Sequence, residues 1–177
     1  MSVILGIDPG SRVCGYGLIK AVGNKLEYIS SGCIRVEHLP FMDRLQNIHA
    51  GISEIIKKYQ PDEVALEEIF VGKSAVSALK LGQARGAVIV ACTNQGLSIH
   101  EYPPNQIKKA LVGRGRAEKS QMQHMVTSIL ALSSMPQKDA ADALCVAVCH
   151  VHTRASLIKM GAGQGSRNSR LQDKIRR

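Results

Sequence analysis

Several features are missing from this chain of 177 residues, and each absence narrows the class of protein. The five cysteines are odd in number and include no C-x-x-C pair, which favours reduced thiols over a disulfide framework. No run approaches the roughly 18 apolar residues of a membrane span. The N-terminus lacks a basic segment followed by an apolar stretch and a small-residue cleavage site, so we expect no secretory signal. These absences together predict a cytoplasmic protein with no membrane partner.

Acidic residues are also scarce, with 14 Asp and Glu against 23 Lys and Arg, a formal net charge of +9. An excess of this size suggests a polyanionic partner, most simply nucleic acid. Charge alone equally fits a merely soluble basic protein. The length suits one domain, and a chain of this size buries roughly 70% of the surface that its unfolded form exposes.

The apolar pattern predicts an α/β protein. Three strands near the N-terminus suggest an antiparallel meander, and a strand that follows the first helix suggests a parallel crossover. That helix has an apolar stripe at steps of three and four residues. We expect strands at 3–8, 14–20, 26–35, 63–66 and 97–102, and helices at about 40–60, 74–95, 105–112, 118–132 and 137–153.

Three further stretches have compositions that we interpret before turning to chemistry. One helix face carries the small residues Ala78, Gly82 and Gly86, which let another backbone approach closely. That backbone is either the sheet or the same helix of a second subunit, and the sequence slightly favours the sheet. Cys145 and Cys149 lie near two histidines in a spacing that fits no zinc pattern, so we expect them in the core. Residues 159–177 read as a basic, disordered tail after a domain spanning 1–158.

Four acids interrupt otherwise apolar elements. Asp8 and Glu67 end two strands that should be neighbours in one sheet, where open α/β sheets keep their ligand sites. Asp139 and Asp142 are three apart and so project from one face of the last helix. Turn capping and the helix dipole explain each acid separately. They do not explain why each of these apolar elements carries one.

If the four acids converge, they repel one another and stay ionised only with a cation. Magnesium prefers carboxylate oxygens, and a pair of such ions roughly 3.5–4 Å apart holds the attacking and leaving oxygens of a phosphodiester. A basic surface around a carboxylate cluster therefore points to a nuclease or nucleotidyl transferase.

Several segments resemble one known family. Gly6 to Ser11, Leu66 to Phe70, Ser77 to Gly86 and Asp139 to Leu144 closely resemble motifs of the RuvC family of bacterial Holliday-junction resolvases, and Ala117 to Gln121 also matches. The resemblance covers about residues 1–155, in order and with the right intervals.

The resemblance implies a ribonuclease H-like fold, a five-stranded mixed sheet flanked by helices on both sides. It implies a homodimer that binds four-way junction DNA, nicks two opposite strands in recombination and repair, and works with the branch-migration proteins RuvA and RuvB. By that likeness Asp8, Glu67, Asp139 and Asp142 are catalytic and bind two Mg²⁺ ions, for which Mn²⁺ substitutes.

Other site residues have two interpretations each. Phe70 either lies under its loop or stacks on a base loosened at the crossover, and the family pattern supports stacking. Lys119 is either a solvated lysine at a helix start or a group that meets the scissile phosphate, and the matching family lysine favours the second role. Lys108 is a weaker case of the same kind, and Lys73 contacts phosphates or is solvated.

Arg114 and Arg116 depart from the family motif and either strengthen phosphate contact or are neutral variation. Two rival functions remain open. One is an actin-like phosphotransferase, which needs two such domains and a longer chain. The other is a junction-binding scaffold without catalysis, for which Asp8→Asn should leave both binding and cellular role intact.

Overall fold

The computed structural model describes residues 1–23, 25–69, 74–113, 115 and 117–175, with residues 159–175 described by their backbone only. Its strands are β1 (Ser2–Asp8), β2 (Val13–Val22), β3 (Lys25–Arg35), β4 (Glu63–Glu67) and β5 (Ser98–Tyr102). Its helices are α1 (Phe41–Tyr59), α2 (Ala75–Thr93), α3 (Pro104–Val112), α4 (Lys119–Ile129) and α5 (Lys138–Ile175). The order of elements along the chain agrees with the order that the apolar pattern predicts.

The strands form one mixed sheet in the order β3-β2-β1-β4-β5. The first three strands make the expected antiparallel meander, and β4 and β5 add to β1 in parallel. Parallel neighbours need a crossover, which α1 and α2 supply. The sheet therefore places the carboxyl ends of β1 and β4 side by side at one edge.

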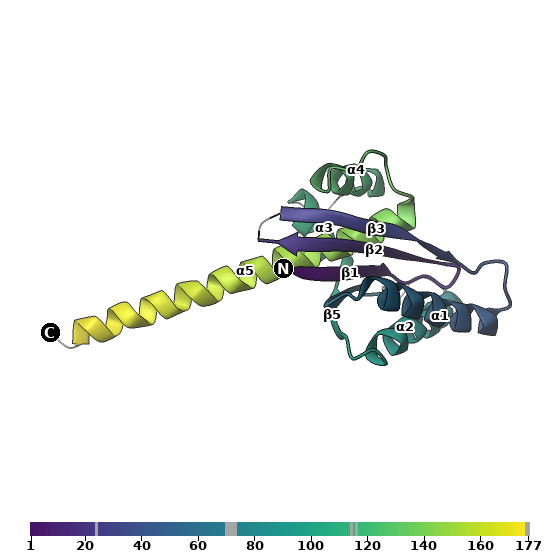
Figure 1. The fold of residues 1–177 in the computed structure, drawn as a ribbon, viewed down its shortest axis with the longest axis horizontal. Coiled ribbons are helices and arrows are strands. Elements are labelled where there is room, and N and C mark those ends of the chain that lie inside the picture. The colour runs from purple at the N-terminus through teal and green to yellow at the C-terminus, as the bar shows by residue number, and fades with distance from the viewer. Residues whose placement is uncertain (24, 70–73, 114, 116, 176–177) are drawn as a thin grey trace.

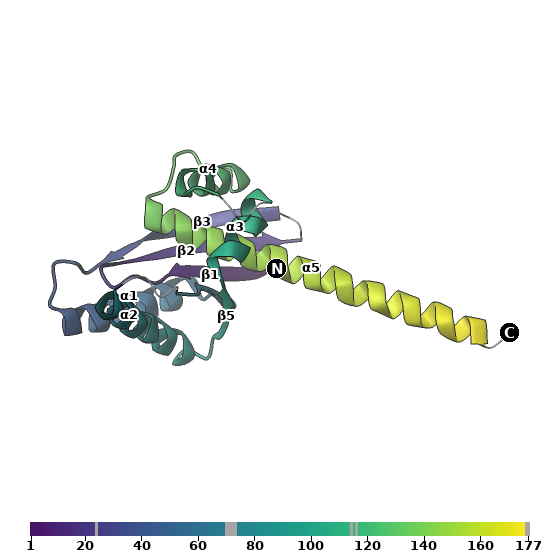
Figure 2. The same cartoon turned by 180° about the vertical axis from the view of Figure 1, so that it is seen from behind.

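Helices cover both faces of the sheet, as expected, with α1 and α2 on one face and α3, α4 and α5 on the other (Figures 1 and 2). Successive residues of a strand point to opposite faces. Leu5 and Ile7 accordingly lie in the core beneath α1 and α2, whereas Ile4 lies in the core beneath α5. The same alternation turns Asp8 toward α5.

Helix α5 rests directly on the backbone of β1 and β2. A Cβ atom added at Gly6 would lie 2.1 Å from the carbonyl oxygen of Ala143, and one at Gly15 would lie 2.1 Å from that of Asp139. Only glycine lets the helix come this close, because any side chain would collide with the helix backbone. Two glycines in the sheet therefore fix the height of α5 above it.

The small-residue stripe of α2 does not face the sheet, so the interpretation slightly favoured from sequence is wrong. Added Cβ atoms at Gly82 and Gly86 would meet nothing within 4 Å. The buried side of the helix carries Ala84, Val88 and Ala91, and it packs on α1. Among the described residues, α2 is the one helix whose length and composition would suit a membrane span, although no continuous run of 18 apolar residues occurs in it.

The last helix is longer than the sequence predicted. It runs past Thr153 because residues 154–160 contain neither proline nor glycine to end it. Its C-terminal part projects beyond the rest of the molecule (Figures 1 and 2). The division of the chain into a domain ending at 158 and a basic tail stays a prediction.

Candidate active site

Asp8 and Glu67 lie next to each other at the end of two paired strands. Ile7 of β1 is paired with Leu66 of β4 in parallel register, so the residue after each belongs to the same row of the sheet. Leu66 lies in the core with α1 and α2, and alternation therefore points Glu67 to the α5 side, as it does Asp8. The sequence prediction that these two acids end neighbouring strands is confirmed.

The first turns of α5 bring two more acids over this edge. Asp139 and Asp142 lie on α5, whose backbone is seated on Gly15 and Gly6. Both residues are half-buried, whereas the residues around them, from Ala140 to Val151, are almost entirely core. The close contact between helix and sheet thus aims carboxylates of α5 at the acids of β1 and β4.

Three of these four acids open into one cavity of about 250 Å³. Asp8, Glu67 and Asp142 line it, together with Lys108 and Lys119 from α3 and α4. Asp139 is not among the lining residues, although its charge reaches Asp8. The cavity therefore gathers carboxylates from three separate elements and two lysines from two others.

The electrostatics of the cavity oppose full ionisation of its acids. Burial, followed by the charges of Glu67 and Asp142, raises the pKa of Asp8 to about 8. Burial and the charge of Asp142 also raise the pKa of Glu67, although Lys119 and a hydrogen bond with Asp8 partly offset that increase. Without a cation, one proton is therefore held between Asp8 and Glu67 near neutral pH.

Lys119 is the counter-charge at this site. Its Nζ lies 3.1 Å from Oδ2 of Asp142, and its side chain is 66% exposed. Burial lowers its pKa, but contact with Asp142 and the charges of Asp8 and Glu67 outweigh this, so the pKa of Lys119 is raised. A capping box between Glu118 and Gln121 begins α4 and holds Lys119 at the mouth of the cavity.

The remaining predicted DNA-contacting residues are Phe70, Lys73, Arg114 and Arg116, and all four lie outside the described residues. Their neighbours Glu68 and Ile69 line the cavity, and Gly113 and Gly115 are exposed. Lys80 is also exposed, and its Nζ lies 5.5 Å from the ring centre of Phe41.

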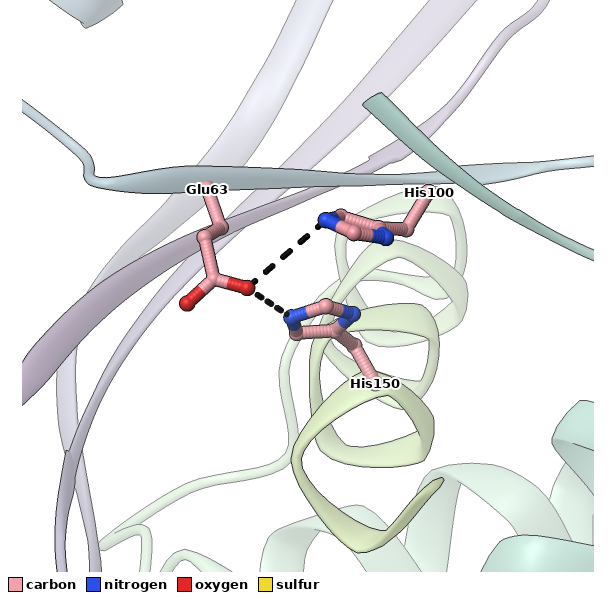
Figure 3. A group of neighbouring side chains, drawn as sticks. All are labelled: Glu63, His100 and His150. Atoms are coloured by element: carbon pink, nitrogen blue, oxygen red, sulfur yellow. Dashed lines mark hydrogen bonds and ion pairs between the residues drawn. The ribbon is translucent and has the colours of Figure 1, made fainter. Parts of the chain in front are cut away.

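A second polar cluster was not predicted from the sequence. Glu63, His100 and His150 bring a carboxylate oxygen and two imidazole nitrogens together at the other end of β4 (Figure 3). In the part of the chain that the structure describes, this is the one group of three His, Cys, Asp or Glu side chains whose ligand atoms all lie within 4.8 Å of one another. Cys145 and Cys149 are buried core residues, as expected.

Comparison with known proteins identifies the family. The family described as "Crossover junction endodeoxyribonuclease RuvC" matches residues 4–150. The RuvC protein of Photobacterium profundum is 56% identical over 173 residues, covering 97% of this chain and 100% of that protein. That of Shewanella loihica is 60% identical over 161 residues, covering 91% and 93%.

Solved structures of similar proteins point to the same family. RuvC of Thermus thermophilus in complex with Holliday junction substrate is 34% identical with a TM-score of 0.82, covering 87% of this chain and 95% of that one. The yeast mitochondrial Holliday junction resolvase Ydc2 is 12% identical with a TM-score of 0.65, covering 88% and 80%, and shares the fold. The expected ribonuclease H-like fold is confirmed, and the chain belongs to the RuvC family of crossover junction endodeoxyribonucleases.

Proposed function

We propose that this protein resolves Holliday junctions by metal-dependent nicking of two opposite strands, in homologous recombination and DNA repair. The observation that carries the proposal is the cavity in which carboxylates from β1, β4 and α5 meet beside two lysines. Carboxylates buried together cost free energy unless a cation binds them. Family membership identifies the reaction as endonucleolytic cleavage of a crossover junction.

The acid cluster fits a hard divalent cation. Its donors are carboxylate oxygens, which are the ligands that Mg²⁺ and Mn²⁺ prefer. The pKa values of Asp8 and Glu67 are raised first by burial and then by the negative charge of neighbouring acids, and a bound cation would offset both effects. Asp8, Glu67, Asp142 and Asp139 would hold two Mg²⁺ ions, which supply an activated water and stabilise charge on the phosphate oxygens.

The lysines act on the substrate side of the cavity. Because its side chain is largely exposed, Lys119 can reach from Asp142 to a scissile phosphate at the mouth of the cavity. A positive group at that position stabilises charge that develops on the phosphate during cleavage. Lys108 lines the same cavity from α3 and is suited to holding the neighbouring phosphate.

Further contacts to the junction rest on the match to the family motifs. Phe70 is proposed to stack on an exposed base, because an aromatic ring binds any base by its face. Lys73, Arg114 and Arg116 are proposed to contact backbone phosphates. A cytoplasmic location is proposed from family membership alone. On the same ground, RuvA and RuvB are proposed as partners.

A homodimer is supported by the outer face of α2. Val76, Leu79 and Val90 are 63%, 70% and 48% exposed, and they lie at helical spacing with Gly86, beside which space is open. An apolar stripe with small residues lets two helices approach closely. Pairing of α2 with its copy would place two cavities in one particle, as cleavage of two strands requires.

The decisive experiment measures nicking of a synthetic four-way junction and of a matched linear duplex, with and without Mg²⁺. Asp8→Asn should bind the junction but cut it at least about 100-fold more slowly, because the variant cannot complete the carboxylate cluster. Asp43→Asn, a matched change on the exposed face of α1, should cut normally. Cleavage by Asp8→Asn at the parental rate would overturn the metal assignment. If the parent binds junctions without cutting them, the non-catalytic scaffold is the better description.

A further inference from the structure

We propose that Glu63, His100 and His150 form a second metal site, which takes a transition-metal cation such as Zn²⁺ and is separate from the acid cavity. The three side chains come from β4, β5 and α5 and point toward one another (Figure 3). Two imidazoles and one carboxylate are a ligand set that suits zinc, whereas magnesium prefers oxygen ligands alone. The site therefore differs from the acid cavity in both place and chemistry.

The distances between the ligand atoms suit a single ion. Nε2 of His150 lies 2.8 Å from Oε2 of Glu63, and Nε2 of His100 lies 3.7 Å from the same oxygen. Ligands around tetrahedral zinc are about 3.3 Å apart, given metal–ligand bonds of about 2.0–2.1 Å. The observed distances lie on either side of that value. A small rotation of His100, whose side chain is 44% exposed, would shorten the longer of the two distances.

His150 and Glu63 each already have an outer partner. Tyr102 Oη lies 2.8 Å from Nδ1 of His150, and Arg154 donates to Oε1 of Glu63. Outer hydrogen bonds of this kind orient metal ligands and fix the imidazole tautomer. Arg154 also donates to Ser2 Oγ at 2.7 Å, which holds its guanidinium on the far side of the carboxylate. Oε2 and the two Nε2 atoms are thus left to face one another.

Proton balance permits binding without an added base. His150 is buried, and its two ring nitrogens face Tyr102 and Glu63. Because an ionised Glu63 can only accept, the tautomer that satisfies both contacts has Nε2–H donating to Glu63 and Nδ1 accepting from the hydroxyl of Tyr102. When an ion takes Nε2, the proton resides on Nδ1 and the Tyr102 oxygen accepts it. The change is one of tautomer and not of charge.

The two sites lie at opposite ends of the same contact between β4 and α5. Glu63 and Glu67 are four residues apart on a strand, or about 13 Å. Asp142 and His150 are eight residues apart on a helix, or about 12 Å. Because α5 runs antiparallel to β4, one end of the contact holds the acid cavity and the other holds the second site. A cation there would clamp α5, which carries Asp139 and Asp142, to the sheet.

The test is a titration of the full chain with ZnCl₂ by calorimetry, in excess Mg²⁺ to occupy the acid cavity. We expect one zinc per chain in the parent and in His124→Ala, an exposed histidine on α4 that serves as the matched control. His100→Ala should bind at least tenfold more weakly, and because His100 is exposed the variant should fold. Zinc should also raise the melting temperature of the parent more than that of His100→Ala.

Nitrogen NMR of the histidine side chains gives an independent readout of the same site. Zinc should move the proton of His150 from Nε2 to Nδ1 in the parent and leave the tautomer of His124 unchanged. Equal zinc affinity in the parent and in His100→Ala would overturn the proposal, as would absence of binding at millimolar zinc. Zinc binding that is lost in Asp8→Asn but kept in His100→Ala would assign the ion to the acid cavity and equally overturn it.

Discussion

At the scale of single residues, Asp8 shows how the acid cavity lowers the stability of the metal-free protein. Its carboxylate is buried beside Glu67 and Asp142, and its pKa is raised to about 8. A raised pKa means that the folded, metal-free protein binds a proton that the unfolded chain releases at much lower pH. At neutral pH ionisation of Asp8 therefore favours the unfolded chain, because the metal-free fold keeps this carboxyl protonated.

This gives a prediction for Asp8→Asn that needs no substrate. As pH rises from about 4 to about 8, the parent should lose roughly 1.4 kcal/mol per unit relative to the variant, because only its unfolded state is ionised there. Without metal, the variant should melt at the higher temperature at pH 8, and the difference should shrink as pH falls. The measurement is thermal unfolding from pH 5 to pH 8.

Saturating Mg²⁺ provides the internal control for this measurement. A cation that binds only the folded parent stabilises it, so added Mg²⁺ should raise the melting temperature of the parent more than that of Asp8→Asn. Asp43→Asn should follow the parent under both conditions. A variant that melts below the metal-free parent at pH 8 would contradict the electrostatic account of Asp8.

Residues of the acid cavity were predictable from sequence, whereas those of the second cluster were not. Asp8 and Glu67 each interrupt an apolar run at a strand end, and such an interruption is visible in the sequence itself. Glu63, His100 and His150 each fit their own element without conflict, and only the packing of α5 on β4 and β5 brings them together. His150 lies close in sequence to Cys145 and Cys149, but its partners Glu63 and His100 come from the strands β4 and β5.

At the scale of elements, the position of α5 depends on bare backbone in the sheet. The added Cβ of Gly6 would lie 2.1 Å from Ala143 O and 2.8 Å from Ala147 N, which are atoms of the helix backbone. A helix backbone cannot yield locally as a flexible side chain can. Any side chain at Gly6 must therefore lift α5, and with it Asp142, away from β1 and β4.

Gly6→Ala is predicted to destabilise the protein by about 3 kcal/mol or more, at the upper end of overpacking costs. Metal-dependent cleavage should also fall, because Asp142 moves away from Asp8. Chemical denaturation and the nicking assay measure the two effects. Gly51→Ala is the matched control, because the atoms nearest its added Cβ are side-chain atoms of Ile34, at 2.8 Å for Cδ1 and 3.2 and 3.3 Å for Cγ1 and Cγ2, and not helix or strand backbone. Alanine also favours helix by about 0.5–1 kcal/mol. A Gly6→Ala protein as stable as the control would contradict this account of the contact.

The elements themselves were largely predictable, because periodicity and turn residues are local signals. The structure confirms the helix that the apolar stripe of α1 predicts and the two strands that end in acids, β1 and β4. The orientation of α2 was not, because a helix rich in small residues on several sides has no unique buried face in sequence. Packing on α1 fixes the orientation of α2 by burying Ala84, Val88 and Ala91. The predicted end of α5 at Thr153 follows the apolar pattern, which ends there, but residues 154–160 contain neither proline nor glycine and the helix continues.

At the scale of the whole molecule, assembly is tested on the open face of α2. Leu79→Glu should convert a dimer to a monomer in sedimentation experiments, because a carboxylate would be buried at the proposed contact. Leu157→Glu places the same charge on an apolar residue of α5 that is 64% exposed, and it should leave the assembly unchanged. A Leu79→Glu protein that sediments as the parent does would exclude this face as the dimer contact.

Net charge governs how the molecule meets DNA. A chain with a formal charge of +9 attracts a four-way junction as a whole, but only lysines that touch phosphates release counterions on binding. The junction affinity should therefore fall steeply as the salt concentration rises. The slope of log affinity against log salt is proportional to the number of phosphates contacted. Lys108, which lines the cavity, and Lys57, which is exposed on α1, allow contact to be separated from overall charge.

Lys108→Gln is predicted to reduce the steepness of log affinity against log salt by about 0.9, the value for one lost phosphate contact on duplex DNA. Lys57→Gln removes the same charge from the last turn of α1 and should lower the affinity slightly without changing the slope. The measurement is junction binding by Asp8→Asn carrying either change, because that background binds without cutting. Equal slopes for the two variants would show that Lys108 acts only through net charge and does not contact a phosphate.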